Sequence, residues 1–478
     1  MAHKKIVIVG GGITGLAAAY QLLKSGTDAD VTLVEASDRV GGIVQTEHVE
    51  GFVIERGPDS FLKTKLHARQ LAVELGLEPQ FISPRSHRLY FVHKSRLESL
   101  PPGMVLGIPT RAKGAWNTPL LSKKGVLRAL AEPVVPVRRG NGDESVLEFL
   151  SRRLGREAAT RIAAPLLSGV FAGDAAELSI QSTFPQLIEL EKNYGSLLGG
   201  LFAQRSGIVG EANALTRAAQ ILSWMMRDED VADSPFVSLA GGMGGLVDAI
   251  VDALPPEWIQ TNCQAHSVLP AKSGGWTVAT EGAGVLEADA VLLTTPARVS
   301  QRILPAGALR EELGQIPFRS TVIVTFALES EGLGHDLNGV GFVAPDRDRR
   351  LIAGTFSSSK WSGRAPRGKV LLRAYLCEYP QGSRLCDASD ATLVGWAQAG
   401  LLKLFGRVGQ PLFTRVVRYR QASPQPVVGH QQRMAGIDRE LENFPGVYLA
   451  GAGLRGVGLP DCIRQGREAG RRILADLG

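Results

Sequence analysis

The chain has 478 residues, 44% of them hydrophobic and 21% charged, and a formal net charge of +6 at pH 7. This composition excludes a disordered chain, and the length exceeds the roughly 250–300 residues that one hydrophobic core usually serves, so we expect two or three domains. No recognition motif or aromatic-interleaved basic stripe accompanies the positive charge, so we expect no nucleic-acid partner.

The first predicted elements form a strand–turn–helix–strand unit. Residues 5–9 (KIVIV) and 30–34 (DVTLV) predict strands, and residues 16–23 predict a helix. The turn between them is a G-x-G-x-x-G motif, in which glycines allow a tight turn and let a pyrophosphate approach the backbone: Gly10, Gly11, Gly12, Ile13, Thr14 and Gly15. Glu35, at the end of the second strand, can accept hydrogen bonds from both ribose hydroxyls of an adenine nucleotide. This unit alone does not distinguish NAD from FAD.

The segment from about residue 85 to 205 changes in character. Helical stretches at 126–131, 145–154 and 157–167 alternate with Pro/Gly breaks, which predicts a mostly helical insertion. Basic residues gather in one part of it: Arg111, Lys113, Lys123, Lys124, Arg128, Arg138 and Arg139. Such a cluster can rest against an anionic membrane surface, or it can serve solubility alone.

Further strands are predicted at 275–279, 290–294, 321–328 and 370–376, and a glycine turn followed by an amphipathic helix comes after Leu239. The chain closes with a second strand–turn–helix unit, whose helix is expected from about Ile463. Its turn predicts a second anion site at a helix N-terminus, formed by Gly451, Gly453, Val457, Gly458, Leu459 and Pro460. The four cysteines form no C-x-x-C pair, and we expect no metal and a reducing compartment.

The residues after the second strand resemble the flavoprotein superfamily of amine oxidases, phytoene desaturases and protoporphyrinogen oxidases. Residues 35–42 (EASDRVGG) match its E-x-x-x-R-x-G-G pattern, and residues 55–60 (ERGPDS) match its next segment. The resemblance implies that FAD is the cofactor. It places Glu35, Ala36, Arg39 and Gly42 along the adenosine, pyrophosphate and ribityl chain, and the segment of Gly57, Pro58, Asp59 and Ser60 near the flavin.

Three other segments resemble the protoporphyrinogen oxidase family more specifically. They are 456–462 (GVGLPDC), 168–174 (SGVFAGD) and 356–366 (FSSSKWSGRAP). The first lacks the two aromatics that many amine oxidases place around the flavin. The last has Trp361 where the family usually has Phe, which leaves the geometry of a substrate-stacking role open.

The resemblance covers essentially the whole chain and implies an α/β fold. Its Rossmann-like FAD-binding domain is expected from discontinuous segments, 1–84, 238–298 and 429–478. A mixed-sheet substrate domain is expected from 206–237 and 299–428, and the mostly helical insertion, 85–205, is the candidate for peripheral membrane contact. By the same resemblance we expect a cytoplasmic protein on the inner face of the cell membrane.

The activity implied is oxidation of protoporphyrinogen IX to protoporphyrin IX in haem biosynthesis. Removal of six electrons requires three flavin cycles, each with molecular oxygen as acceptor and hydrogen peroxide as product. We assign no catalytic side chain, because the flavin carries the chemistry. Arg88 is expected to bind a propionate, with Arg96 as the alternative, and Gly169, Leu337 and Trp361 to line an apolar slot. Coupling to the next enzyme of the pathway is a further expectation.

Alternative functions share this fold. A phytoene-type desaturase would carry the same glycine motifs, but a carotenoid needs no carboxylate-binding arginine. An amine oxidase is disfavoured by the missing aromatic pair. Rab escort and dissociation-inhibitor proteins bind lipidated partners without redox chemistry, and the intact pyrophosphate motif argues against that class.

Overall fold

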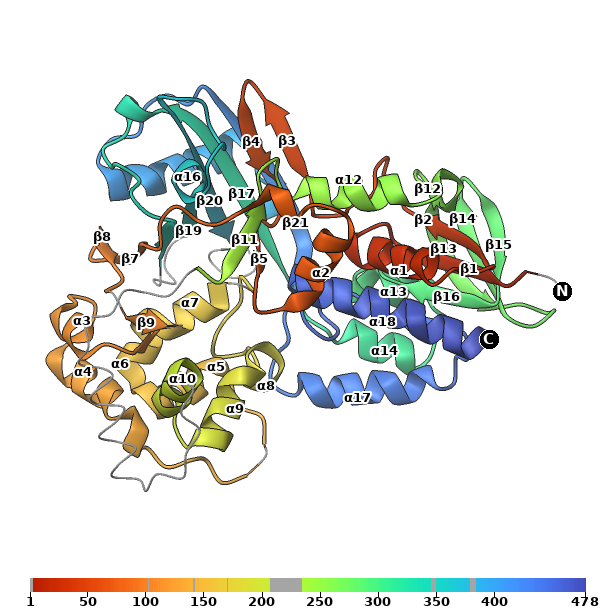
Figure 1. The fold of residues 1–478 in the computed structure, drawn as a ribbon, viewed down its shortest axis with the longest axis horizontal. Helices are drawn as coiled ribbons and strands as arrows, with labels where there is room; N and C mark the ends of the chain where they lie inside the picture. The colour runs from red at the N-terminus through yellow and green to blue at the C-terminus, as the bar shows by residue number, and fades with distance from the viewer. Residues whose placement is uncertain are drawn as a thin grey trace.

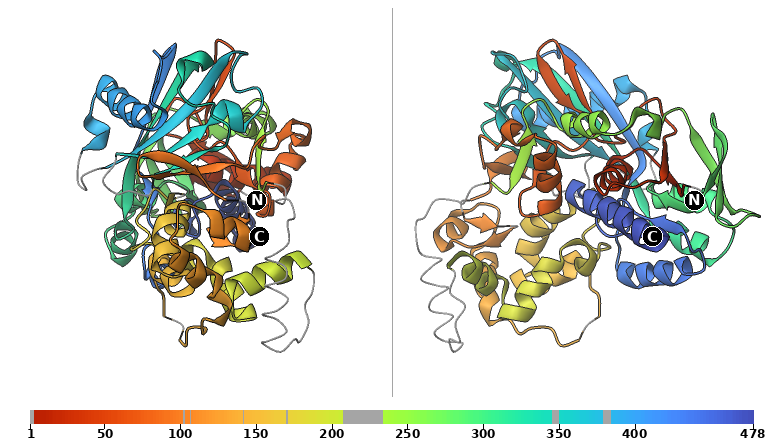
Figure 2. Two further views of the ribbon diagram at one scale, coloured as in Figure 1. Left: turned by 90° about the vertical axis from the view of Figure 1, so that its left-hand side faces the viewer. Right: turned by 45° about the vertical axis from the view of Figure 1, so that its right-hand side comes forward.

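The computed structural model describes residues 3–101, 103–105, 107–140, 142–169, 171–206, 234–344, 350–378 and 384–478. These residues form three parts: a parallel sheet between layers of helices, a large mixed sheet, and a helical lobe (Figure 1). In both views of Figure 2 the helical lobe lies below and the mixed sheet above. The α/β architecture with a discontinuous Rossmann-like domain is as the sequence predicts.

In the described chain, five parallel strands build the Rossmann-like sheet. Their order is β12 (Ile259–Gln260), β2 (Asp30–Val34), β1 (Lys5–Val9), β16 (Ala290–Leu293) and β22 (Val447–Leu449). Segments from the beginning, middle and end of the chain therefore share one sheet. Along β1, Ile6 and Ile8 face one core while Val7 and Val9 face another, so both sides of the sheet are covered.

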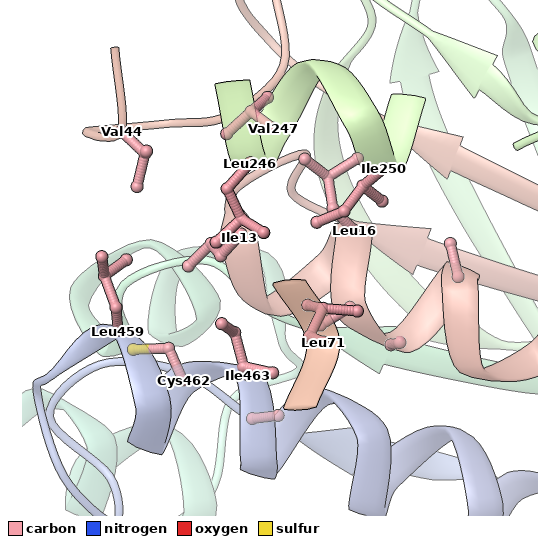
Figure 3. Packing of buried hydrophobic residues seen from close by; sticks show 14 of the residues in the cluster. Ile13, Leu16, Val44, Leu71, Leu246, Val247, Ile250, Leu459, Cys462 and Ile463 are labelled. Atoms are coloured by element: carbon pink, nitrogen blue, oxygen red, sulfur yellow. The ribbon is translucent and has the colours of Figure 1, made fainter. Parts of the chain in front are cut away.

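One face of this sheet packs against four helices: α1 (Ile13–Lys24), α2 (Leu66–Glu74), α12 (Gly244–Ala253) and α18 (Leu459–Leu477). Figure 3 shows Ile13 and Leu16 of α1 lying between residues of α12 and Leu459, Cys462 and Ile463 of α18. Helices α1 and α18 approach closely, since a Cβ on Gly466 of α18 would lie 2.2 Å from the carbonyl oxygen of Thr14 in α1.

The opposite face is covered by an antiparallel meander and three helices. The meander consists of β13 (Gln264–Pro270), β14 (Trp276–Glu281) and β15 (Gly284–Ala288). The helices are α13 (Ala297–Ile303), α14 (Ala308–Gly314) and α17 (His430–Leu441).

Seven described strands form the mixed sheet. Their order is β21 (Phe413–Pro424), β17 (Phe318–Glu329), β20 (Lys369–Cys377), β19 (Leu351–Phe356), β18 (Gly341–Val343), β7 (Leu89–His93) and β8 (Arg96–Ser99). Helix α16 (Asp390–Phe405) covers one face, and the hairpin of β3 (Thr46–Val49) and β4 (Phe52–Glu55) lies against the other. Pairs are antiparallel except β18 with β7. The short α15 (Ser357–Lys360) follows β19.

The helical lobe gathers around one apolar core that includes Phe149, Ile162 and Leu187. Its helices are α3 (Ala112–Asn117), α4 (Lys123–Leu130), α5 (Val146–Leu154), α6 (Arg156–Ala158), a π-helical turn (Ala159–Ala163), α7 (Ala164–Gly169), α8 (Ile180–Thr183), α9 (Pro185–Tyr194) and α10 (Leu197–Ser206). A capping box of Ser145 and Glu148 starts α5.

The structure changes the prediction for residues 85–205 at one end. Residues 89–99 contribute β7 and β8 to the mixed sheet, because the largely apolar run Leu89–His93 pairs with β18 as well as with β8. Short pairs also occur nearby, namely β9 (Met104–Val105) with β10 (Ile108–Pro109), and β11 (Phe236–Leu239) with β5 (Phe61–Leu62) and β6 (Phe81–Ile82). Of the predicted segment 206–237, residues 207–233 lie outside the described chain, so the domain boundaries remain predictions.

Within the described ranges, no helix has the length and apolar character needed to cross a membrane. In the same residues, His, Cys, Asp and Glu side chains form no group of three that could hold a metal ion.

Candidate functional site

The carboxyl ends of β1, β2, β16 and β22 meet at one edge of the Rossmann-like sheet. Gly10, Glu35, Thr294 and Gly451 stand there, each just after or near the end of its strand. Helices α1 and α18 both begin at this edge, since each follows a parallel strand. In open α/β sheets this edge is where ligands bind, and two helix N-termini there offer backbone N–H groups to an anion.

The predicted glycine turn forms a cradle between β1 and α1. A Cβ on Gly15 would lie 2.1 Å from the Gly10 carbonyl oxygen, so the close approach of turn and helix needs glycine there. At Gly12, by contrast, a Cβ would meet no described atom within 4 Å. Ile13 and Thr14 are buried in the first turn of α1, where the backbone N–H groups have no partner within the helix and no side chain caps them. An open glycine at the start of a helix fits the diphosphate of a dinucleotide.

Glu35 lies at the rim of this cradle. Its carboxylate accepts hydrogen bonds from the Gly11 N–H (2.8 Å), the Ser37 N–H (2.9 Å) and the Ser37 hydroxyl (2.7 Å). Ala36 is exposed beside it. These bonds hold the carboxylate at the end of β2, the position from which a ribose is bound in this fold.

A second turn, residues 39–42, closes over the first. The Gly41 N–H donates to the Gly11 carbonyl (2.7 Å), and a Cβ on Gly42 would lie 3.3 Å from the Gly12 Cα. The Arg39 guanidinium folds onto its own turn, donating to the carbonyls of Val40 (2.8 Å) and Gly42 (2.6 Å). Arg39 and Gly42 therefore lie beside the cradle, and their contacts with a cofactor stay predictions.

The segment Gly57–Ser60 continues away from the cradle toward the mixed sheet. A Cβ on Gly57 would lie 1.8 Å from the Ile43 carbonyl oxygen, which stacks this segment directly on the turn that follows Gly42. Asp59 accepts hydrogen bonds from the Lys360 ammonium (2.9 and 3.0 Å), the Trp361 indole (3.2 Å) and the Ser60 hydroxyl (2.8 Å). Burial alone would raise the pKa of the Asp59 carboxyl, but Lys360 and then Arg373 lower it well below its usual range.

The C-terminal turn brings the remaining predicted cofactor residues to the same edge. Gly451 and Gly453 adopt φ of +139° and +90°, and a Cβ on Gly453 would lie 2.4 Å from Pro424. Helix α18 starts at Leu459 with Gly458 as N-cap and Pro460 in its first turn, earlier than the predicted Ile463. Val457 packs against the core of the helical lobe. This turn therefore connects the Rossmann-like sheet to the lobe.

A cavity of about 350 Å³ lies behind this turn. It is bounded by α8, α17 and residues 453–457, and by Phe171 of the helical lobe. The cavity reaches Gly453 and Val457 from the side of α17.

The four predicted substrate residues are not gathered on one surface. Trp361 and Leu337 are buried, the first bonded to Asp59 and the second in the core of the mixed sheet at φ +52°. Arg88 is exposed just before β7, and Gly169 is exposed at the end of α7; Arg96 is also exposed. The side chains of Trp361 and Leu337 pack against other residues of the protein and do not line an open slot. Their contacts with a substrate remain predictions.

Three residues near the site were given no role by the sequence analysis. The Arg364 guanidinium donates to the Leu239 and Ala240 carbonyls (both 2.8 Å), and Arg373 donates to the Gly57 carbonyl (2.6 Å). Glu55 lies 3.5 Å from Arg364, and burial raises the pKa of its carboxyl despite a hydrogen bond from the Met243 N–H. An arginine within the apolar run 370–376 is the signal that could have pointed to Arg373.

A family model for flavin-containing amine oxidoreductases matches residues 13–474. The chain belongs to this family. A flavin is therefore its cofactor, and the open cradle at Gly12, the rim carboxylate of Glu35 and the two helix N-termini fit FAD.

Relatives within this family carry porphyrinogen names. A coproporphyrinogen III oxidase of Bacillus subtilis (strain 168) is 35% identical over 473 residues, covering 98% of this chain and 97% of the relative. A protoporphyrinogen oxidase of Bos taurus is 31% identical, covering 98% of each chain. A crystal structure from Exiguobacterium sp. 255-15, provisionally assigned as a protoporphyrinogen oxidase, superimposes with a TM-score of 0.85 at 31% identity and covers 100% of this chain and 99% of the other.

Proposed function

We propose that this chain oxidises a porphyrinogen to the corresponding porphyrin in haem biosynthesis. The observation that carries the proposal is that relatives matching 98% of the chain are named for this one reaction, although their names specify two different porphyrinogens. The reaction removes six electrons from the macrocycle. FAD, when bound, accepts two of them per cycle, so three cycles are needed, with molecular oxygen as the proposed acceptor and hydrogen peroxide as the product.

The residues of the chain would hold and orient the cofactor. The turns of Gly12, Gly42 and Gly451 hold the dinucleotide through backbone groups, and Glu35 fixes its ribose. The flavin end would then reach the segment Gly57–Ser60, where the Rossmann-like sheet meets the mixed sheet. No side chain is assigned as a proton acceptor.

Two porphyrinogens are candidates. The segment resemblances favour protoporphyrinogen IX, which carries two propionates, whereas the bacterial relative is named for coproporphyrinogen III, which carries four. Arg88 is proposed to bind a propionate, because the residue is exposed before β7, where its guanidinium interacts with Tyr90, and a guanidinium suits a carboxylate. Coproporphyrinogen III, with four propionates, would require more such cations than protoporphyrinogen IX.

Peripheral membrane contact is proposed for the helical lobe. Exposed apolar side chains there include Trp116, Leu127, Val134 and Val137. Lys123 lies 4.8 Å from the Trp116 ring, which sets a cation beside one of these apolar side chains. Apolar side chains flanked by cations suit an anionic leaflet, and contact with it would place the enzyme where a poorly soluble tetrapyrrole gathers. Coupling to the next enzyme of the pathway is proposed as well and would pass the product on.

The test is aerobic turnover of both porphyrinogens by the purified yellow protein. Porphyrin fluorescence and peroxide are followed together against a no-enzyme control for autoxidation. We expect three peroxides per porphyrin, and the ratio of kcat/KM for the two substrates identifies the physiological one. Bound FAD without turnover of either porphyrinogen would overturn the proposal and move the search to carotenoid precursors and amines. A colourless protein would point instead to a binding protein.

A further inference from the structure

A buried charged seam joins the Rossmann-like part to the mixed sheet. Its members are two carboxylates from the first segment and three cations from α15, the loop after it and β20: Glu55, Asp59, Lys360, Arg364 and Arg373. The side chains of Asp59 and Lys360 are 13% and 14% exposed, and those of Glu55 and Arg364 are 3% and 1% exposed. Arg373 is buried as well.

The charged seam is connected to the dinucleotide cradle by close backbone contacts. Gly42 stands against Gly12, and Gly57 stands against the carbonyl of Ile43, the residue after Gly42. Gly57 in turn accepts a hydrogen bond from Arg373, and Asp59 lies two residues farther on. A cofactor extending from the cradle along this path reaches the charged seam with the end that is remote from the adenosine.

The charges of the seam do not balance. Three cations face two carboxylates, which leaves one positive charge in excess among these described side chains. The adjacent half-buried group of Glu47, Arg56 and Arg415 adds two more cations and one carboxylate. In addition, the Nε atoms of Arg364 and Arg373 are buried without a hydrogen-bond partner in the described chain. Buried donors beside an excess of positive charge favour a nearby anion.

We propose that the charged seam holds the segment Gly57–Ser60 against the flavin end of FAD, and that its excess positive charge favours the reduced cofactor. Two-electron reduction with uptake of one proton adds one negative charge to the flavin, and the electrons come from the substrate. The Lys360–Asp59 pair is the adjustable part, because removing either partner changes the charge of the seam by one unit in opposite directions. The inference rests on the proposed placement of the flavin and not on which porphyrinogen is oxidised.

The experiment is a measurement of the midpoint potential of the bound flavin, made by equilibration with reference dyes and without any porphyrinogen. Lys360→Met removes a positive charge and should shift the reduction equilibrium about tenfold toward the oxidised flavin, which is about 30 mV for a two-electron couple. Asp59→Asn removes a negative charge and should shift it by a similar factor toward the reduced flavin. A tenfold shift corresponds to one charge within about 10 Å at an effective dielectric constant of about 20.

Three matched variants complete the test. Lys272→Met removes the same charge from the exposed turn between β13 and β14 and should leave the potential unchanged. The double variant Lys360→Met/Asp59→Asn keeps the net charge of the seam and should return to the wild-type potential, as should Lys360→Arg. If Lys360→Met does not retain flavin, Asp59→Asn, Lys360→Arg and the double variant still provide the comparison. Shifts of the same sign in the two single variants, or shifts no larger than that of Lys272→Met, would overturn the proposal.

Discussion

The cofactor end and the substrate end of the predicted site are built in different ways. At the cofactor end, backbone geometry defines the site: Gly15 and Gly57 stand where a Cβ would strike a carbonyl oxygen, and Gly12 stays open. At the substrate end, side chains define it, and Leu337 and Trp361 are buried while Arg88 is exposed. A site made by backbone turns can be recognised from short local motifs, whereas a site made by distant side chains depends on how whole segments pack.

The largest effect should come from breaking the cofactor end. Gly15→Val would place side-chain atoms against the Gly10 carbonyl, so we expect FAD binding to weaken more than hundredfold and the free energy of unfolding to fall by about 4 kcal/mol. Flavin absorbance and urea unfolding measure both. Gly395→Ala in α16, where a Cβ meets open space, is the control and should be neutral or stabilising by up to about 1 kcal/mol. Full flavin content in Gly15→Val would refute the close-contact argument.

The next largest effect is expected in the charged seam, which connects the cofactor end to the substrate end. Asp59→Asn leaves Lys360 without its carboxylate, and we expect a loss of about 2–3 kcal/mol in unfolding free energy at pH 7. Because the pKa of Asp59 is lowered on folding, its stabilising contribution is complete above the unfolded value of 3.8 and is lost as pH falls below it. Urea unfolding at pH 7, 4.5 and 3 should show a wild-type advantage that is constant down to pH 4.5 and then shrinks by about 1.4 kcal/mol per pH unit. An advantage that grows toward pH 3 would contradict this assignment.

At the substrate end, Arg88→Ala should raise KM for the porphyrinogen about tenfold to hundredfold while FAD content stays unchanged. The reason is loss of a charge-assisted bond to a propionate. Arg96→Ala, at the start of β8, is the matched variant. Steady-state kinetics on both variants decide between the two arginines, and an unchanged KM in Arg88→Ala would remove Arg88 from the site.

The smallest effect is expected from Glu35→Gln. The amide retains the shape of the side chain but weakens the bond that the carboxylate accepts from Gly11 and the bond proposed from the ribose, so FAD affinity should fall about tenfold. Isothermal titration of the flavin-free protein with FAD measures the change. A loss as large as that of Gly15→Val would mean that the side chain at the rim, and not the backbone of the turn, carries most of the binding.

The same contrast explains how much could be predicted from the sequence. Strands 5–9 and 30–34 were predicted with their observed ends, because a glycine turn and an apolar β-branched run mark them locally. The start of α18 was predicted four residues late, since Leu459 and Pro460 resemble a loop until Gly458 is recognised as the N-cap. The entry of residues 89–99 into the mixed sheet depends on pairing with β18, about 250 residues away, which no local pattern records.

The buried position of Trp361 could not be predicted from the sequence for the same reason. Its indole contacts Asp59, which lies about 300 residues earlier in the chain, and nothing in the segment 356–366 indicates that partner. The ion pair of Asp59 with Lys360 was hidden for the same reason. Short motifs therefore identified the cofactor and the kind of enzyme, while the seam between the two sheets required the three-dimensional structure.

The order of strands in the Rossmann-like sheet has a consequence for synthesis on the ribosome. β1 and β2 emerge about 400 residues before β22 and α18, and α18 covers α1 at the cradle. Until then β16 is an open edge and the part of α1 that packs on α18 is uncovered, which is the kind of surface on which unfinished chains associate. A nascent chain must therefore reach β22 and α18 before it can close around FAD, and we expect it to need protection from association until then.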